Sequence, residues 1–256
     1  MPSLYRCSFD EFPKNANRVQ EGVADDGAAL ISNCVQEPTL EELRDQIRKL
    51  PTRSTRRSRA GTSYATRKLL DSERFRALSA EPPFALLVSL VLGPQARPIR
   101  GLLFDKSPDA NWKVPWHQDL SIAVAERVDI PEYGPWSKKG GVVHTHAPVS
   151  VLEKCLAIRL HLDHSNEQRG ALQIIPQSHR LGKLLPEYIC TATQNRTAIW
   201  CTAAPGDILL MHPLVLHRSS PATHPTRRRT IHFEYSSATL PQGLSWAYSR
   251  ATPSAK

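Results

Sequence analysis

Cysteine is scarce in this sequence, and its cysteines do not form a recognisable set. The chain has five, an odd number, and no Cys-x-x-Cys spacing: Cys7, Cys34, Cys155, Cys190 and Cys201. A disulfide framework or a zinc knuckle needs paired or closely spaced cysteines. The pattern therefore predicts reduced thiols, which are typical of a cytoplasmic protein.

Long apolar runs are also lacking. No stretch of about 18 apolar residues occurs, as a membrane-spanning helix would require. The first residues, Met1–Cys7, contain no apolar core of a secretory signal. We therefore expect a soluble, unexported protein with no membrane partner.

Aromatic residues make up only 7% of a chain whose formal net charge is +9. A basic protein can bind nucleic acid, but a single-strand binding surface needs aromatic side chains between its arginines. The most basic segment, Arg53–Arg59, has none. It is interpreted as an exposed, solvated loop, with electrostatic steering of an anionic small molecule as the alternative. No nucleic-acid partner is expected.

The 256 residues are enough for one domain with a sizeable core. Residues 1–95 are expected to be mostly helical, 96–240 to be rich in strands, and 241–256 to be a tail. Helical spacing predicts helices over Thr39–Leu50, with Thr39 and Glu42 as a capping box, over Tyr64–Ala80, and over Phe84–Leu92. Such helices fit a mainly β protein with helices packed on a barrel.

Alternating side chains predict strands over Ile99–Phe104 and Cys155–Asp163. A further strand should start after the turn Pro205-Gly206-Asp207 and hold His217 at its far end. The segment 126–148 is rich in proline and glycine, so it is predicted to be a long loop, interpreted as a lid. Its histidines, His144 and His146, are expected to be solvated.

The segment Trp116-His117-Gln118-Asp119 places His117 and Asp119 on one face of an extended chain and Gln118 on the other. An imidazole and a carboxylate are two of the three ligands in the facial triad that binds Fe(II) and leaves positions open. Spacing alone allows a second such pair, His161 and Asp163. The third ligand could be His217 or, less well placed, His212.

Three consecutive arginines follow in Arg227-Arg228-Arg229. Alternation puts Arg228, Thr230 and His232 on one face of a strand, opposite Arg227 and Arg229. A buried guanidinium needs an anionic partner, so this face is expected to line a polar pocket that holds a carboxylate.

At this point the chain resembles the phytanoyl-CoA dioxygenase-like (PhyH) family of Fe(II)/2-oxoglutarate-dependent oxygenases. The matching motifs keep the family's order from about Gly101 to Tyr235. They are Trp116-His117-Gln118-Asp119, Gly170-Ala171-Leu172, Pro176-Gln177-Ser178-His179-Arg180 with Gly182, Pro205-Gly206-Asp207, His217 with Ser219, and Arg228.

The resemblance implies a double-stranded β-helix, also called a jelly-roll or cupin-like core. It implies Fe(II) bound by His117, Asp119 and His217, and 2-oxoglutarate bound by Arg228, with Ser219 and Gln118 lining its pocket. O2 would be consumed, 2-oxoglutarate would become succinate and CO2, and an aliphatic C–H of a small molecule would be hydroxylated. Ascorbate would support the activity.

Two other functions use the same residues. A zinc-dependent hydrolase or isomerase in a cupin-type barrel could also use two imidazoles and a carboxylate. A non-enzymatic anion-binding module would use the basic loop and need no metal. Arg228 favours the oxygenase, because a hydrolase has no general need for a group that binds a dicarboxylate. The motifs do not specify the substrate or the oligomeric state.

Overall fold

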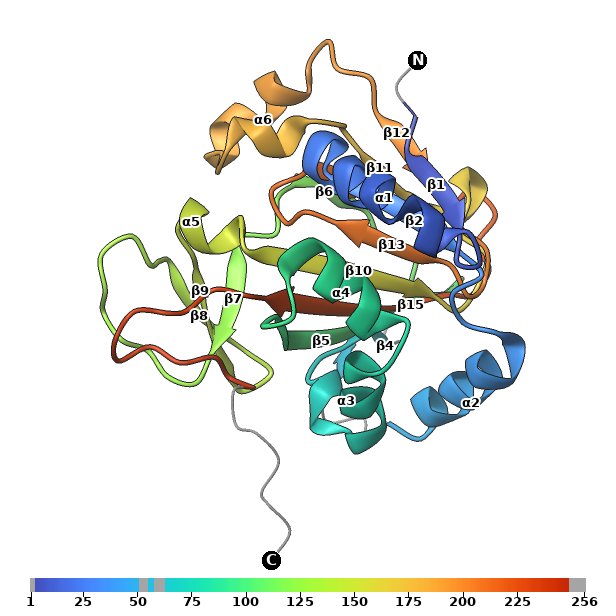
Figure 1. Ribbon diagram of the computed structural model, residues 1–256, viewed down its shortest axis with the longest axis horizontal. Coiled ribbons are helices and arrows are strands. Elements are labelled where there is room, and N and C mark those ends of the chain that lie inside the picture. Colours follow the sequence, from blue (N-terminus) through green and yellow to red (C-terminus); the bar gives the residue numbers. More distant parts are fainter. Residues whose placement is uncertain (1–2, 51–54, 58–62, 249–256) are drawn as a thin grey trace, which may run out of the picture.

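The computed structural model describes residues 3–50, 55–57 and 63–248 (Figure 1). Its largest sheet runs through the centre of the molecule, and only the β1–β2 pair in it is parallel. In spatial order its strands are β1 (Tyr5–Ser8), β2 (Ala28–Ser32), β13 (Ile208–Met211), β10 (Cys155–His161), β15 (Arg228–Ser236), β5 (Arg97–Lys106), β4 (Ser63–Thr66) and β3 (Thr55–Arg57).

A second, smaller sheet packs against the main sheet and closes the barrel. Its strands, in spatial order, are β12 (Ile199–Cys201), β11 (Leu172–Ile174), β14 (His217–Ser219) and β6 (Val114–His117). Leu172 and Ile174 of this sheet share an apolar cluster with Leu209 and Met211 of the main sheet. Two facing sheets of this kind form the predicted double-stranded β-helix.

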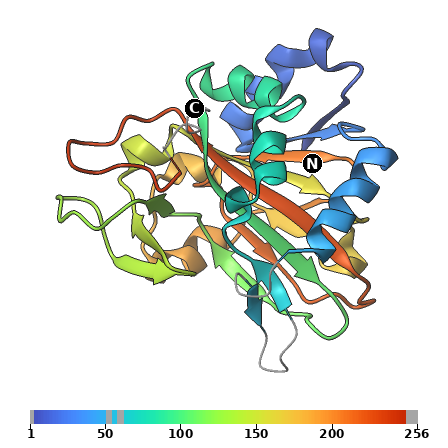
Figure 2. The same cartoon turned by 90° about the horizontal axis from the view of Figure 1, so that it is seen from below.

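Four helices cover the outer face of the main sheet (Figures 1 and 2). They are α1 (Phe12–Asp26), α2 (Glu37–Arg48), α3 (Glu73–Ala80) and α4 (Phe84–Leu92), and they share one large apolar cluster with the sheet. Two further helices, α5 (Val149–Leu152) and α6 (Pro186–Thr193), lie in loops elsewhere. Short 3-10 turns cover Leu69–Asp71, Glu167–Arg169 and Ser178–Leu181.

β15 shows why the helices pack on one face only. Its outward residues Ile231, Phe233 and Tyr235 are all buried in the cluster beneath the helices. Its inward residues Arg228 and His232 line a cavity between the two sheets. The alternation that the sequence predicts for this strand therefore separates an apolar face from a polar one.

The N-terminal region is less helical than expected. Residues of β1, β2 and β4 extend the main sheet, and Ser63–Thr66 is a strand, whereas a helix was predicted from Tyr64. Pairing of β4 with β5 outweighs the local helical spacing, and the helix α3 starts only at Glu73. The predicted capping box is also wrong, because α2 starts at Glu37 with Pro38 in its first turn, and Glu42 pairs with Arg74 instead.

The segment 126–148 is not a plain loop. β8 (Trp136–Lys139) and β9 (Val142–His146) form a hairpin, and β9 also pairs with β7 (Ser121–Val124). Gly140 and Gly141 have the positive φ angles, 60° and 84°, that the turn requires. His144 is buried in this three-stranded sheet, so the expectation that it is solvated is wrong.

The expected tail and the basic segment are each described only in part. Leu244 and Trp246 are buried, and Trp246 forms an isolated β-bridge with Val124, so the start of the expected tail packs on the domain. Of Arg53–Arg59, only the backbone of Thr55–Arg57 is described, as β3. The rest of this basic segment, and with it the steering hypothesis, lies outside the described residues.

Among the described residues, no single helix is long and apolar enough to cross a membrane. The bent pair α3 and α4 meets the criteria of length and composition only when its two helices are taken together.

Candidate metal centre and its cavity

Two strands of the small sheet bring the predicted metal ligands together. β6 ends at His117, β14 begins at His217, and these two residues face each other in the antiparallel pair. The prediction of one strand from Ile208 to His217 is wrong, because β13 ends at Met211 in the main sheet and the chain crosses to the small sheet. This crossing delivers His217 beside His117.

Asp119 completes the cluster. Its backbone N–H donates to the Pro213 carbonyl over 2.8 Å, which fixes the chain just after β6. The Asp119 carboxylate lies 3.5 Å from His217 Nε2 and 3.9 Å from His117 Nε2. One donor atom from each residue lies within 4.8 Å of the other two, an arrangement that could hold one metal ion. The sequence-predicted triad therefore meets in space.

A backbone carbonyl two residues earlier in the chain orients each histidine ring. His117 Nδ1 is 2.9 Å from the Pro115 carbonyl, and His217 Nδ1 is 2.9 Å from the Val215 carbonyl. A carbonyl only accepts, so each Nδ1 carries the proton and donates it. Each Nε2 then has a free lone pair directed at Asp119, which is the tautomer that binds a metal.

Charges at the triad favour a divalent cation. Burial, together with the neighbouring His117, lowers the pKa of His217 to about 3. Burial works against the charged form of Asp119, but attraction to the neighbouring histidines in their protonated form and to the permanent charge of Arg100 outweighs it and holds the pKa of that carboxyl below its usual range. Near neutral pH the cluster thus has a neutral buried imidazole and a carboxylate, which suits a metal ion.

The triad opens into a cavity of about 120 Å³ between the two sheets. Its walls carry three arginines, Arg100, Arg159 and Arg228, together with Ser219 and His232. Apolar side chains cover the remaining wall: Leu102, Phe104, Trp112, Val114 and Leu172. The cavity therefore joins the metal-binding cluster to a cationic chamber, as recognition of an anionic ligand requires.

Arg228 projects into this cavity as the alternation of β15 predicts. Its neighbours point outward, where Arg227 pairs with Asp105 and Arg229 pairs with Asp163, each over 2.8 Å. The Arg228 guanidinium has only a long contact of 3.5 Å to Ser165, and its buried Nε has no hydrogen-bond partner. Burial and the nearby Arg159 lower the pKa of Arg228 to about 10, so it remains a cation.

Ser219 lines the same cavity and is held in place by two bonds. Its hydroxyl donates to the Gly170 carbonyl over 2.9 Å and accepts from Lys106 Nζ over 3.0 Å. Lys106 is opposite Arg228 in the β5–β15 pair and is buried. Burial and Arg228 lower the pKa of Lys106 to about 7.

The structure does not bring Gln118 to the cavity. Its amide donates to the carbonyls of Gly182 and Leu214, and its oxygen accepts from the Leu184 N–H, each over 2.8 Å. The side chain points away from His117 and Asp119, as alternation along the strand dictates. Gln118 instead holds two loops against the strand that carries the metal ligands.

The alternative ligands lie elsewhere. Asp163 accepts hydrogen bonds from the backbone N–H and the guanidinium of Arg229. His161 is buried, and neither of its ring nitrogens has a partner. His212 accepts from the Leu214 N–H and packs against His179, whose Nε2 is 3.0 Å from the Ala24 carbonyl. The described structure therefore supports only the first His-x-Asp pair.

A buried polar network next to the triad was missed by the sequence analysis. Glu234 pairs with Arg100 and with His232 Nε2, and His232 Nδ1 is 3.0 Å from Arg159. Alternation along Cys155–His161 and Arg228–Ser236 could have revealed it, since it puts Arg159, His232 and Glu234 on the inner face. Apolar residues alternate with these polar ones along both strands and form the opposite face.

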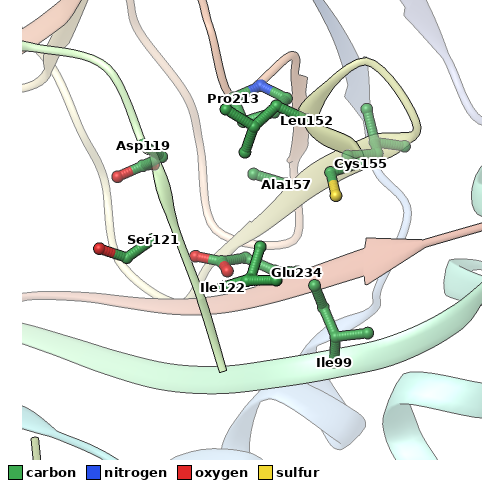
Figure 3. A pocket seen from close by; sticks show the side chains of 10 residues that line it. Ile99, Asp119, Ser121, Ile122, Leu152, Cys155, Ala157, Pro213 and Glu234 are labelled. Carbon is green, nitrogen blue, oxygen red and sulfur yellow. The ribbon is translucent and has the colours of Figure 1, made fainter. Parts of the chain in front are cut away.

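A smaller chamber lies on the other side of Asp119 (Figure 3). Apart from Asp119, Ser121 and Glu234, its walls are apolar side chains: Ile99, Ile122, Leu152, Cys155, Leu156, Ala157 and Pro213. In Figure 3 Asp119 and Ser121 lie at the left of the chamber, and Glu234 lies near its middle, beside Ile122. Asp119 also lines the larger cavity, so the two spaces meet at this residue.

The fold and the triad together define a class, the double-stranded β-helix proteins with a 2-His-1-carboxylate metal site. Comparison with known proteins narrows it. A model of the family described as phytanoyl-CoA dioxygenase (PhyH) matches residues 23–230, and the chain belongs to this family. Its members use oxygenase chemistry based on iron and 2-oxoglutarate. No curated protein sequence matches the chain.

Solved structures agree on the fold. EctD from S. alaskensis in its apoform has a TM-score of 0.68 at 16% identity, with 92% of this chain and 81% of EctD covered. The epimerase SnoN from nogalamycin biosynthesis has a TM-score of 0.66 at 18% identity, with 94% of this chain and 93% of SnoN covered. AviO1 from Streptomyces viridochromogenes Tue57 has a TM-score of 0.66 at 19% identity, with 88% of this chain and 96% of AviO1 covered. At such low identity these likenesses establish the shared fold alone.

Proposed function

We propose that this protein is an Fe(II)/2-oxoglutarate-dependent dioxygenase that oxidises an aliphatic C–H bond of a small molecule. One observation carries the proposal: His117, Asp119 and His217 share a single cavity with Arg228, a buried guanidinium whose Nε has no hydrogen-bond partner. The triad fits a divalent metal, and Arg228 fits the far carboxylate of a dicarboxylic acid.

Bound Fe(II), with 2-oxoglutarate and O2, supplies an oxidant able to remove hydrogen from an unactivated carbon while 2-oxoglutarate becomes succinate and CO2. The residues of this chain provide the geometry. His117 and His217 would hold the metal through their Nε2 lone pairs, Asp119 would add a negative charge, and all three residues line the cavity. Arg228 and Ser219 would hold the distal carboxylate and thereby fix how the co-substrate approaches the metal.

The apolar part of the wall is suited to a hydrocarbon substrate. Leu102, Phe104 and Trp112 lie on the same cavity as the triad, so an aliphatic group held against them is close to the metal positions. The related fold performs more than one reaction, since SnoN is an epimerase and SnoK a carbocyclase, both α-ketoglutarate-dependent. The fold alone does not specify the reaction. For this chain we propose hydroxylation, the default outcome when such an oxidant removes hydrogen from an aliphatic carbon. The proposed substrate is a small, anionic molecule.

Succinate release tests the proposal. Purified protein is incubated with Fe(II), ascorbate and 2-oxoglutarate, and wild type is compared with His117→Ala and Arg228→Ala. We expect slow uncoupled turnover that is lost in the first variant and needs far more 2-oxoglutarate in the second. Arg227→Ala is the matched control, because Arg227 adjoins Arg228 but pairs with Asp105 at the surface.

A protein that binds neither Fe(II) nor 2-oxoglutarate would contradict the proposal. Binding is measured separately by calorimetry, because some oxygenases turn over only with their substrate present. If zinc bound tightly and 2-oxoglutarate did not bind at all, the zinc hydrolase or isomerase would replace the oxygenase, since the same three donors satisfy catalytic zinc.

A further inference from the structure

Arg159 is a second buried cation in the cavity, and the proposed function does not use it. It lies on β10, its exposure is 7%, and it lines the same cavity as the triad and Arg228. Its guanidinium has one hydrogen bond, between Nη1 and His232 Nδ1, and its buried Nε has no partner. In the described part of the chain, no carboxylate lies within ion-pair distance of it.

The nearby carboxylate is already occupied. Glu234 pairs with Arg100 and accepts from His232 Nε2, so His232 has its proton on Nε2 and accepts from Arg159 at Nδ1. This chain of bonds orients Arg159 without neutralising it. A desolvated guanidinium is costly unless an anion joins it, so the network predicts an anionic ligand.

The position of Arg159 identifies which end of the cavity that anion occupies. Arg159 is opposite His232 in the β10–β15 pair, and His232 offers a ring nitrogen within 4.8 Å of an Asp119 oxygen. Arg228 lies four residues earlier on β15, opposite Lys106. The two arginines are therefore at different levels of the barrel, with Arg159 at the level of the metal-binding cluster.

We propose that Arg159 binds the carboxylate of 2-oxoglutarate that adjoins its keto group, while Arg228 binds the distal carboxylate. This inference rests on the proposed function and adds a second binding residue to it. Two arginines at the two ends of a short dicarboxylate would select both its length and its charge. A substrate carboxylate is the other source of an anion at Arg159, and the experiment separates the two.

The experiment measures binding rather than turnover. Calorimetric titrations under anaerobic conditions with Fe(II) compare 2-oxoglutarate with 2-oxopentanoate, which keeps the keto acid and lacks the distal carboxylate. The variants are Arg159→Met and Arg228→Met, with Arg227→Met as the matched control. Losing a charge-assisted pair is expected to weaken binding of 2-oxoglutarate roughly 10- to 100-fold in either variant.

The two ligands then distinguish the arginines. For 2-oxopentanoate, Arg159→Met should still weaken binding by a similar factor, whereas Arg228→Met should have no further effect. If Arg159→Met leaves the affinity for both ligands unchanged, the inference is overturned, and the anion at Arg159 comes from the substrate. If its effect disappears with 2-oxopentanoate, Arg159 binds the distal carboxylate and the inference is also overturned.

Failure of the proposed function has a different signature. Wild type would then bind neither ligand, whereas failure of this inference alone leaves a wild type whose affinity depends on Arg228. Arg159→Lys serves if Arg159→Met does not fold. A lysine keeps the charge but loses the planar fork, so Arg159→Lys should weaken the binding of both ligands by a smaller factor than Arg159→Met. An unchanged affinity for both ligands would reject the assignment.

Discussion

His117 and His217 face each other directly across the β6–β14 pair, and their ring centroids lie 4.1 Å apart. They are 100 positions apart in the sequence, so a site that uses both rings exists only when the two strands are paired. A metal ion that binds both rings should in turn hold the strands together. We therefore expect metal binding and folding to be coupled in this protein.

The first prediction concerns this coupling. At a divalent metal concentration about 100 times its Kd, the folded wild type should gain about 2.7 kcal/mol, seen as a higher Tm. His217→Ala should abolish the metal-dependent rise because it removes one of three ligands. The measurement is a thermal melt with and without metal. His224→Ala, at an exposed histidine, is the control, and an equal rise in His217→Ala would refute the assigned ligand set.

The second prediction concerns Gln118. Gln118→Ala removes three hydrogen bonds to the backbone of the two loops near Gly182 and Leu214. We expect the free energy of unfolding to fall by about 1–3 kcal/mol, because buried backbone groups lose their partners. Urea denaturation measures this change. The affinity for 2-oxoglutarate should stay the same, and a loss of affinity with unchanged stability would support the cofactor-lining role that the family resemblance implies.

The third prediction is a pH dependence centred on Lys106. Its pKa is lowered to about 7, so the amine is charged below that pH and neutral above it. A dicarboxylate near Arg228 and Ser219 binds better beside a cation, so affinity for 2-oxoglutarate should fall as the pH rises through about 7. Lys106→Met should flatten this dependence. A steep decline that persists in Lys106→Met would assign the titration to another group.

The same lysine affects stability with the opposite sign. Between about pH 7 and 10.4 the unfolded chain holds a proton on Lys106 that the folded chain lacks. Stability therefore rises with pH across this window. Denaturation of wild type and Lys106→Met at several pH values would measure it, with the two curves expected to diverge only in this range.

The fourth prediction compares two ion pairs on the outer side of β15. Arg229 and Asp163 are mostly buried, whereas Arg227 is half exposed beside Asp105. Asp163→Asn should cost about 3–5 kcal/mol because it leaves a buried guanidinium unpaired. Asp105→Asn should cost about 0–1 kcal/mol. Chemical denaturation at neutral pH gives both values, and equal costs would contradict this view of the site.

Acid should remove the contribution of Asp163. Burial opposes its charged form, but the bonds from Arg229 outweigh it and lower the pKa of Asp163. The stabilisation is therefore complete above the unfolded pKa of about 3.9 and is lost as the pH falls through the lower folded pKa. The difference between wild type and Asp163→Asn should shrink only below about pH 4.

The sequence predicted the site well where the alternation of a strand decides the outcome. Arg228 faces the cavity and its two neighbours face outward because successive side chains on β15 alternate. The same rule places Gln118 on the opposite side of the chain from His117 and Asp119, where it bonds to loop backbone, and the pocket-lining role that the resemblance implies stays a prediction. Arg159 obeys the rule too, but its strand is mostly apolar and the inner face was overlooked.

Features that depend on distant pairing could not be obtained from local patterns. The helical spacing of the residues after Thr66 predicts a helix from Tyr64. Ser63–Thr66 nevertheless forms a strand, because it pairs with the edge of β5. Likewise the hairpin of β8 and β9 is stabilised by β7, and the chain between Met211 and His217 changes sheet. In each case the deciding partner lies elsewhere in the sequence.

The carbonyls of Pro115 and Val215, which accept from the Nδ1 atoms of the two histidines, each lie two residues before the ring they orient. Neither imidazole relies on a neighbouring side chain for its direction. A change in the apolar wall of the cavity therefore need not disturb the orientation of these two rings. The orientation of the two imidazoles depends on the backbone, whereas the shape of the cavity depends on its side chains, so the two properties can be altered separately by mutation.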